Sequence, residues 1–227
     1  MRWLKLGALA VIGAGLARLS QRSGVTDDEF TGAMPGDDLI GDPAVEWTRA
    51  ITISKPPAEV WPWLAQMGFG RGGWYTSRLF DRIVWRLDNP SMDTLVEEFL
   101  DVEAGDIIPD GPGHAAYFHV AELQPERWIV YRSVRHPYRG HPVDPTDTAE
   151  TEALEARLVR DGVYLHFSWA WELRPLEMHG TRLLVRTRAT YSPAWIRPLE
   201  IPLGLVDFYH VSTMFRGIAR RVIALPR

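Results

Sequence analysis

Cysteine is absent from the 227 residues of this chain. The protein therefore has no disulfide, no thiolate nucleophile and no cysteine ligand for a metal, and the sequence says nothing about the redox compartment. Basic residues are not in excess either, because 25 Lys and Arg stand against 29 Asp and Glu, for a formal net charge of -4. A protein that binds nucleic acid regardless of sequence needs a basic surface, so no nucleic acid is expected as a partner.

The sequence also has little that could cross a membrane. In the N-terminal stretch MRWLKLGALAVIGAGLARLSQR, the uncharged apolar run over residues 6–17 has 12 residues. A spanning helix needs roughly 20, although the run lengthens if the Lys5 amine reaches the interface. Residues 1–22 are predicted to form an apolar helix, and three interpretations stay open: association with a membrane through residues 3–19, a cleaved secretory signal, or a helix packed on the protein. The protein is accordingly expected at the membrane or in the cytoplasm.

Familiar catalytic and metal-binding patterns are missing as well. The serines in FSWAW and VSTMF do not stand in a Gly-x-Ser-x-Gly elbow, so a hydrolase is not indicated. His136 and His141 flank PYRG, but their spacing is loose and the stretch 136–155 is polar and rich in proline. This composition favours a solvated loop over a zinc site. No metal and no cofactor is expected.

Three glycines in WPWLAQMGFGRGGWYTSRLF match the spacing of a dinucleotide-binding fingerprint. Gly68, Gly70 and Gly73 satisfy Gly-x-Gly-x-x-Gly. That fingerprint needs a strand before it and a helix after it, whereas these glycines follow a predicted helix and no parallel β-α-β pattern surrounds them. They are interpreted as a helix stop and a tight turn, with Arg71 exposed to solvent on that turn.

The hydrophobic pattern predicts one strand, two helices, a series of antiparallel strands and a long final helix. Alternation in VEWTRAITIS predicts the first strand, and the two prolines after it open a helix over 58–67 with apolar residues three or four apart. A second helix is predicted from Trp74, with Leu79, Ile83 and Leu87 buried at four-residue spacing.

Two long strands are predicted in VYLHFSWAWEL and TRLLVRTRATY. Alternate residues of the first, such as Phe167, form an apolar face, and His166 on the other face is expected in solvent. In the second, three arginines, among them Arg186, lie opposite an apolar face. One side of the sheet is therefore expected to be apolar and the other solvated. A helix-like stretch follows Pro198 to the end of the chain.

This order of elements, together with ITISKPPAEVWPWLAQMGFGRGGWYTS, resembles the helix-grip (SRPBCC) superfamily, which groups steroidogenic lipid-transfer domains, polyketide cyclases and the birch-pollen allergen. The pattern PPxxVWPWLxQMGxGRGGWY is more narrowly similar to bacterial members that carry an apolar N-terminal segment and an acidic linker. The resemblance covers roughly residues 24–227. It implies an α+β fold in which a curved antiparallel sheet surrounds a long C-terminal helix, with two short helices after the first strand and an apolar cavity.

The expected organisation has three parts. Residues 1–22 form the apolar N-terminal helix, residues 23–43 a linker with one helical turn beginning at Thr26, and residues 44–227 the helix-grip domain. The superfamily has no universal catalytic residues, so no residue of this chain inherits a chemical role from the resemblance.

An apolar cavity of this kind is expected to bind a hydrophobic small molecule or lipid, oriented by one or two polar groups. The chain has ten tryptophans, which supply packing first and ligand contacts second. The candidate ligand-binding residues combine aromatic walls with polar side chains that have inward-facing neighbours: Trp74, Tyr75, His119, Tyr131, Trp169, Trp171, Tyr209 and His210.

The second hypothesis is an enzyme of the cyclase or aromatase type. Such an enzyme would fold a polyketide-like chain in the same cavity, and a His or Tyr would move protons. Because no catalytic motif accompanies these residues, binding without catalysis is favoured and no catalytic residue is named.

Overall fold

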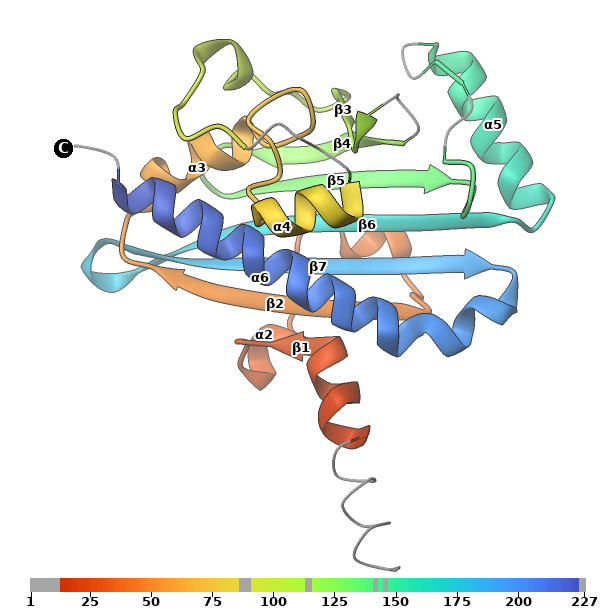
Figure 1. Cartoon of the computed structure of the whole chain (residues 1–227), viewed down its shortest axis with the longest axis horizontal. Coiled ribbons are helices and arrows are strands. Elements are labelled where there is room, and N and C mark those ends of the chain that lie inside the picture. The colour runs from red at the N-terminus through yellow and green to blue at the C-terminus, as the bar shows by residue number, and fades with distance from the viewer. Residues whose placement is uncertain (1–12, 86–90, 113–115, 141–142, 145–146, 225–227) are drawn as a thin grey trace, which may run out of the picture.

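A computed structural model describes residues 13–85, 91–112, 116–140, 143–144 and 147–224 (Figure 1). Its main feature is a curved seven-stranded sheet with the order β1-β2-β7-β6-β5-β4-β3. The strands are β1 (Arg22–Ser23), β2 (Val45–Ile53), β3 (Ile107–Pro109), β4 (Tyr117–Gln124), β5 (Trp128–Arg135), β6 (Tyr164–Leu176) and β7 (Gly180–Ser192). The short β1 runs parallel to β2, and all other neighbours are antiparallel.

The long helix α6 (Glu200–Ala224) follows the 3-10 helix η6 (Ala194–Leu199) and lies across one face of this sheet (Figure 1). Its buried residues include Val211, Met214 and Ile218, which recur every three or four positions. At Gly217 an added Cβ would lie only 2.0 Å from the Tyr75 carbonyl oxygen, so glycine permits the close approach. The predicted α+β helix-grip arrangement, a sheet around a long C-terminal helix, is confirmed.

The predicted first helix is confirmed as α3 (Pro57–Ala65), with proline in its first turn and Val60, Trp63 and Leu64 buried. The chain then turns at Gly68, which has φ of 137°. Arg71 is not in solvent as expected, because its guanidinium donates to the carbonyls of Ala65 and Phe99 at 3.1 and 2.6 Å. This contact satisfies a carbonyl that the end of α3 leaves free.

The second helix differs from its prediction. It begins at Arg78 and consists of α4 (Arg78–Phe80) and a π-helical turn, η2 (Asp81–Trp85). Leu79 and Ile83 were expected to be buried but are 62% and 67% exposed. Trp74 and Tyr75 are instead buried in the core and precede the helix, in residues that belong to no helix or strand, with Tyr75 at a φ of 57°. Leu87, the third residue of the predicted face, lies outside the described residues.

The stretch expected as a solvated loop over 136–155 contains the start of a helix, α5 (Thr148–Arg160), so that prediction is wrong for its second part. Asp147 caps the helix by accepting a hydrogen bond from the Glu150 amide. Thr151, Leu154 and Leu158 are buried and share one side of the helix. Helix α5 packs on β5 (Figure 1), and its Glu155 pairs with Arg132, which faces away from α6 because the neighbouring Tyr131 lies in the core.

The outer face of the sheet was expected to be solvated, and this is wrong for its central part. Arg186 on β7 is 3% exposed, and it donates to carbonyl oxygens of residues 29, 30 and 32 and to the Asp37 carboxylate. The covering segment contains α2 (Asp27–Thr31) and the 3-10 helix η1 (Asp37–Ile40), within the stretch expected as a linker. The predicted helical turn at Thr26 is confirmed by its capping box with Glu29.

The described part of the N-terminal segment, residues 13–21, is helical and leads into β1 (Figure 1). The predicted membrane association through residues 3–19 falls largely on residues 1–12, which lie outside the described residues. Among the helices that the structure does describe, none has both the length and the apolar character needed to cross a bilayer. Two further 3-10 turns complete the fold, η3 (Glu97–Phe99) and η5 (Glu177–His179).

Candidate ligand-binding cavity

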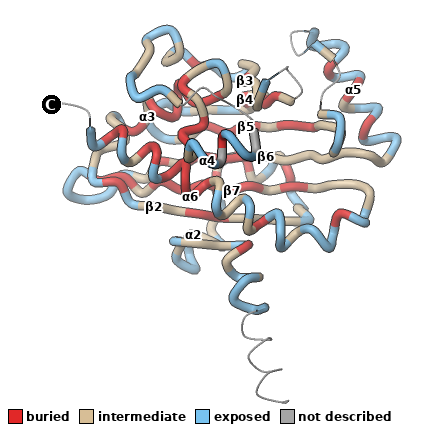
Figure 2. The backbone as a smooth tube through the Cα atoms, in the orientation of Figure 1, coloured by how far each residue is buried: buried red, intermediate tan, exposed pale blue. Residues whose placement is uncertain are grey.

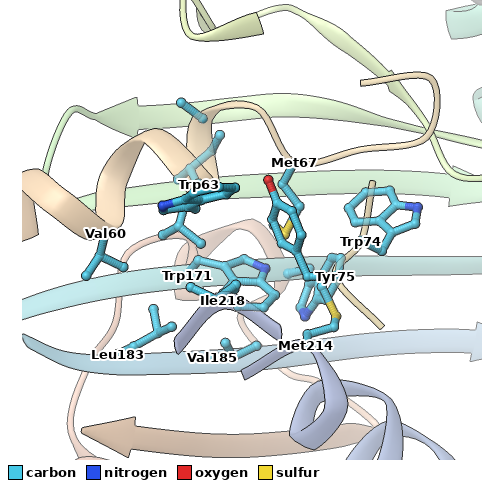
Figure 3. Close-up of a cluster of buried hydrophobic side chains, with 14 of the residues drawn as sticks. Val60, Trp63, Met67, Trp74, Tyr75, Trp171, Leu183, Val185, Met214 and Ile218 are labelled. Carbon is cyan, nitrogen blue, oxygen red and sulfur yellow. The ribbon is translucent and has the colours of Figure 1, made fainter. Parts of the chain in front are cut away.

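One half of the space between the sheet and α6 is filled with side chains. Figure 3 shows Trp63 and Met67 from the α3 region meeting Trp171 of β6, with Met214 and Ile218 of α6 packed against them. Each of these five side chains is fully buried, at 0% exposure. The C-terminal half of α6 therefore rests on a solid core, which is also coloured as buried in Figure 2.

The other half, beside the N-terminal part of α6 and η6, holds a cavity of about 360 Å³. Its walls come mainly from β2, β6, β7, η6 and α6. Most of the lining is apolar: Val45, Trp47, Trp74, Phe118, Leu165, Phe167, Trp169, Ala189, Ile196, Leu203 and Val206. An apolar cavity of ~150 Å³ already admits benzene, and binding pockets range over roughly 300–1,000 Å³. The space suits a ligand of two or three fused rings or an acyl chain of moderate length.

A small group of polar side chains converges on this cavity. Trp169 and Thr187 lie directly opposite each other on β6 and β7, and Asp207 and His210 stand one turn apart on α6. The Thr187 hydroxyl oxygen is 3.5 Å from Asp207 Oδ1, and the rings of Trp169 and His210 are stacked with centroids 6.1 Å apart. All four residues line the cavity, and we call them the polar cluster.

Arg49 on β2 compensates the charge of Asp207 from behind the cavity wall. The Arg49 side chain is 1% exposed, and its Nε donates to Asp207 Oδ2 at 3.1 Å. Its two terminal nitrogens donate to the carbonyls of Leu19, Ser20 and Gly204. Burial nevertheless raises the pKa of Asp207 to about 6, and the nearby guanidinium only partly offsets this effect.

His210 is neutral at neutral pH. Burial lowers the pKa of its imidazole to about 4, with the Asp110 carboxylate acting weakly in the opposite direction. A neutral imidazole carries one donor and one acceptor nitrogen, so His210 can exchange a hydrogen bond with a ligand without carrying a charge.

The indole nitrogen of Trp169 is a buried donor with no acceptor in the described part of the chain. Trp169 is 6% exposed, and its Nε1 has no hydrogen-bond partner among the residues that the structure describes. By contrast, Nε1 of Trp74 on the same cavity wall donates to the Asp110 carbonyl at 2.9 Å. Nε1 of Trp63 and of Trp171 in the packed core is unpaired among the described residues as well, but of these three tryptophans only Trp169 lines the cavity, where a ligand could bring an acceptor.

Two further carboxylates line the cavity, and both already have partners. Asp110 Oδ2 accepts from Arg135 Nη1 at 2.6 Å, and the Glu200 carboxylate accepts from the Tyr191 hydroxyl. The described lining contains neither lysine nor arginine. No group of three or more His, Asp or Glu within the described ranges could hold a metal ion.

The structure divides the eight predicted ligand-binding residues into two groups. Three of them line the cavity: Trp74, Trp169 and His210. Tyr75, Tyr131 and Trp171 face the same side of the sheet but lie in the packed core, at 1%, 0% and 0% exposure. They support the cavity wall without lining it.

The remaining two predicted residues point elsewhere. His119 lies on the outer face of β4, because its neighbours Phe118 and Val120 occupy the core side. Tyr209 is 43% exposed on α6, with its hydroxyl oxygen 3.4 Å from Ser77 Oγ. Neither belongs to the cavity lining.

His166 was expected to be exposed to solvent, and it is less exposed than predicted. It does lie on the outer face of β6, but it is only partly exposed and its Nε2 is buried. Burial, assisted by the positive charge of Arg132, lowers the pKa of His166 to about 4.

Asp207 and Thr187, the acid and the hydroxyl of the polar cluster, were not among the residues predicted from the sequence. A signal existed for each. Asp207 stands three positions before His210, so both occupy neighbouring places on one side of a helix. Thr187 alternates with Val185 and Ala189, so it is a polar residue on an apolar strand face.

The fold and the cavity define an α+β helix-grip protein with an apolar internal site. No family model matches the chain, and no curated protein matches it. Among solved structures, norcoclaurine synthase from Thalictrum flavum is similar at 12% identity and a TM-score of 0.44, over 79% of this chain and 87% of that one.

Two further solved structures are similar at the same level. Protein MLL2253 from Mesorhizobium loti has 13% identity and a TM-score of 0.40, over 79% of this chain and 99% of its own. DynU16, from the dynemicin biosynthetic locus, has 13% identity and a TM-score of 0.40, over 75% of this chain and 46% of its own. Similarity at this level assigns no ligand and no activity to this chain.

Proposed function

We propose that this protein binds a hydrophobic small molecule in the cavity between the sheet and the N-terminal half of α6. The observation that carries the proposal is a space of about 360 Å³ lined by aromatic and aliphatic side chains, with polar groups gathered in one cluster. Burial of an apolar ligand there supplies affinity at roughly 25 cal/mol per Å², and the polar cluster orients the ligand. The cavity is built from residues within 44–227, the range proposed as the binding domain.

A neutral fluorescent probe, N-phenyl-1-naphthylamine, tests this proposal. We expect saturable fluorescence enhancement with the full chain and a rise in its thermal unfolding temperature. The variant Ala189→Leu adds three carbons to the cavity wall and should weaken binding by at least about tenfold. Thr190→Leu places a leucine on the outer face of the same strand and serves as the matched control.

Three results would count against the proposal: no saturable binding, binding that survives Ala189→Leu, or binding that Thr190→Leu weakens equally. The first would mean that the cavity is not a binding site. The other two would place the probe at another surface of the protein.

Catalysis of the cyclase type is the second candidate, favoured by the position of Asp207 and His210 one turn apart on the cavity wall. The Asp207 carboxylate would remove a proton from the carbon between two carbonyl groups of a poly-β-ketone. That carbon would then bond to the carbon of another, more distant carbonyl group of the same chain. The resulting alkoxide would take the proton back. A carboxylate with a pKa of about 6 suits such a base better than one with an ordinary pKa.

A poly-β-ketone thioester incubated with the protein tests this alternative. If the enzyme hypothesis holds, Asp207→Asn and His210→Phe abolish cyclised product while N-phenyl-1-naphthylamine still binds. Tyr131→Phe should have no effect, because Tyr131 does not line the cavity. Turnover that survives the Asp207 and His210 substitutions would exclude these residues as proton carriers.

Membrane association through residues 3–19 is a separate proposal, supported by the uncharged apolar run over residues 6–17 and by the basic residues Arg2, Lys5 and Arg18 around it. Sedimentation with anionic vesicles, comparing the full chain with a chain lacking residues 1–12, tests it. Equal sedimentation of both proteins would refute it.

A further inference from the structure

We infer that the cavity selects neutral apolar molecules that carry a hydroxyl group, held between Trp169 Nε1 and Asp207 Oδ1, and that it disfavours carboxylates of the same size. This inference rests on the proposed binding function and names the ligand class. The inference goes beyond that function because it assigns a hydrogen-bond donor, a hydrogen-bond acceptor and a preference for uncharged ligands.

The donor is Trp169 Nε1. An indole nitrogen can only donate, and this one is buried in the cavity wall without a partner among the described residues. An unpaired buried donor destabilises the protein, so a ligand that brings an acceptor recovers part of that cost on binding. The acceptor can be a hydroxyl or a carbonyl oxygen.

The acceptor is Asp207 Oδ1. The other carboxylate oxygen, Oδ2, is engaged by Arg49, whereas the one partner of Oδ1 among the described residues is the Thr187 hydroxyl at 3.5 Å, the outer limit of a hydrogen bond. A carboxylate has about four acceptor sites, so Oδ1 can take a further donor. A ligand carbonyl cannot supply that donor, but a hydroxyl can.

The residues that carry these two atoms belong to one region of the wall. Trp169 pairs with Thr187 across β6 and β7, Thr187 approaches Asp207, and His210 stacks on Trp169 from the next turn of α6. A hydroxyl group both donates and accepts, so a single ligand group can satisfy Trp169 and Asp207 together.

The charge of the lining decides against anionic ligands. Asp110, Glu200 and Asp207 line the cavity, and no lysine or arginine stands among the described lining residues. Behind the wall, Arg49 and Arg135 are already paired with Asp207 and Asp110, and Arg197 interacts with Tyr191 beside Glu200. Within the lining itself, a ligand carboxylate would lose its hydration and meet only negative or neutral side chains.

A series of ligands that share one ring system tests the inference on the unmodified full chain. Naphthalene, 2-naphthol and 2-naphthoate are compared at pH 7.5 by their displacement of N-phenyl-1-naphthylamine. We expect 2-naphthol to bind about tenfold more tightly than naphthalene, which corresponds to ~1.4 kcal/mol, and 2-naphthoate to bind more weakly than both.

Two variants test whether Trp169 Nε1 causes the tighter binding of 2-naphthol. Trp169→Phe removes the donor and keeps an aromatic ring, so the affinity ratio of 2-naphthol to naphthalene, both measured on the same variant, should fall to about threefold or less. Trp171→Phe is the matched control, because its Nε1 is also buried and unpaired but lies outside the cavity lining. It should leave the advantage of 2-naphthol unchanged.

The outcomes separate this inference from the proposed function. If neither the probe nor naphthalene binds, the proposed function fails. If both bind but 2-naphthoate equals or exceeds 2-naphthol, or if 2-naphthol gains nothing over naphthalene, only the selectivity is overturned. An equal loss of preference in Trp169→Phe and Trp171→Phe would also overturn it, and the ligand series on the unmodified chain decides if either variant fails to fold.

Discussion

The two halves of α6 face the same sheet but meet very different surroundings. At the C-terminal half, α3 inserts Trp63 between helix and sheet, and Met214 and Ile218 are fully buried. At the N-terminal half no described segment takes the place of α3, and Leu203 and Val206 line the cavity while remaining 44% and 52% exposed. The cavity therefore exists because one short helix fills only half of the space.

The two halves are also held in different ways. Apolar packing holds the filled half. In the open half, Arg49 joins β2 to α6 through Asp207 and the Gly204 carbonyl, and to the end of the N-terminal helical segment through the Leu19 and Ser20 carbonyls. In the open half, a buried ion pair and its hydrogen bonds therefore hold the cavity wall in place of apolar packing.

The largest effect is expected for Arg49→Met. This change leaves the Asp207 carboxylate buried without its partner, and breaking a buried pair from one side costs about 3–5 kcal/mol. Urea unfolding of both proteins measures the loss. The double variant Arg49→Met with Asp207→Leu should recover part of the stability, because no uncompensated charge remains. A loss below about 1 kcal/mol in the single variant would mean that the brace contributes little.

A matched pair of substitutions on α6 tests the difference in packing. Ile218→Ala should lower the free energy of unfolding by about 2–4 kcal/mol, because it leaves a void in a filled core. Leu203→Ala should cost less than about 1 kcal/mol, because that side chain is already partly exposed. Equal losses, measured by urea unfolding, would contradict the distinction between a filled and an open half.

The fold was largely predictable because it follows local patterns. Alternation in β6 and β7 places Phe167 and Trp171 on the side of α6, and the prolines that open α3 fix where that helix begins. The failures arise where distant contacts override a local pattern. The outer arginines, such as Arg186, look solvated in the sequence, but the chain between Glu29 and Asp37 covers them from about 150 positions away, at separations of 149 to 157 residues.

The site was less predictable for the same reason. Asp207 is tolerable in an apolar cavity because Arg49 stands behind it, and 158 positions separate the two in sequence. Trp171 and Trp169 share a strand face, yet only Trp169 lines the cavity, since α3 ends before it reaches that part of the sheet. Periodicity shows which face a residue occupies, but it does not show how far the neighbouring helix extends along that face.

A smaller effect is expected from the titration of His210. Its folded pKa of about 4 lies below the ordinary value of 6.5, so its contribution to stability is complete above pH 6.5 and is lost as the pH falls toward 4. Asp207, whose pKa is raised from 3.8 to about 6, acts in the opposite direction as the pH falls from about 6 to its ordinary value, and Asp110 favours protonation of the imidazole.

The difference between the parent protein and His210→Phe isolates this contribution. Relative to the variant, the parent should lose roughly 1–3 kcal/mol between pH 6.5 and pH 4.5. His166 titrates alike in both proteins and cancels. Parallel stability profiles over this range would show that His210 reaches water without a penalty.

The smallest effect is expected when a substitution adds volume to the open half, which is compared with the same addition in the filled half. Ala189→Leu places extra carbon in the open half, where the cavity can accept it, so the free energy of unfolding should change by less than about 1 kcal/mol. Ala65→Leu adds the same volume in α3, where the side chain is 1% exposed within the filled core, and should cost about 1–3 kcal/mol. Urea unfolding of the two variants in the absence of ligand distinguishes these cases. A larger penalty at Ala189 than at Ala65 would mean that the open half is as tightly packed as the filled one, and that no guest molecule fits there without displacing the wall.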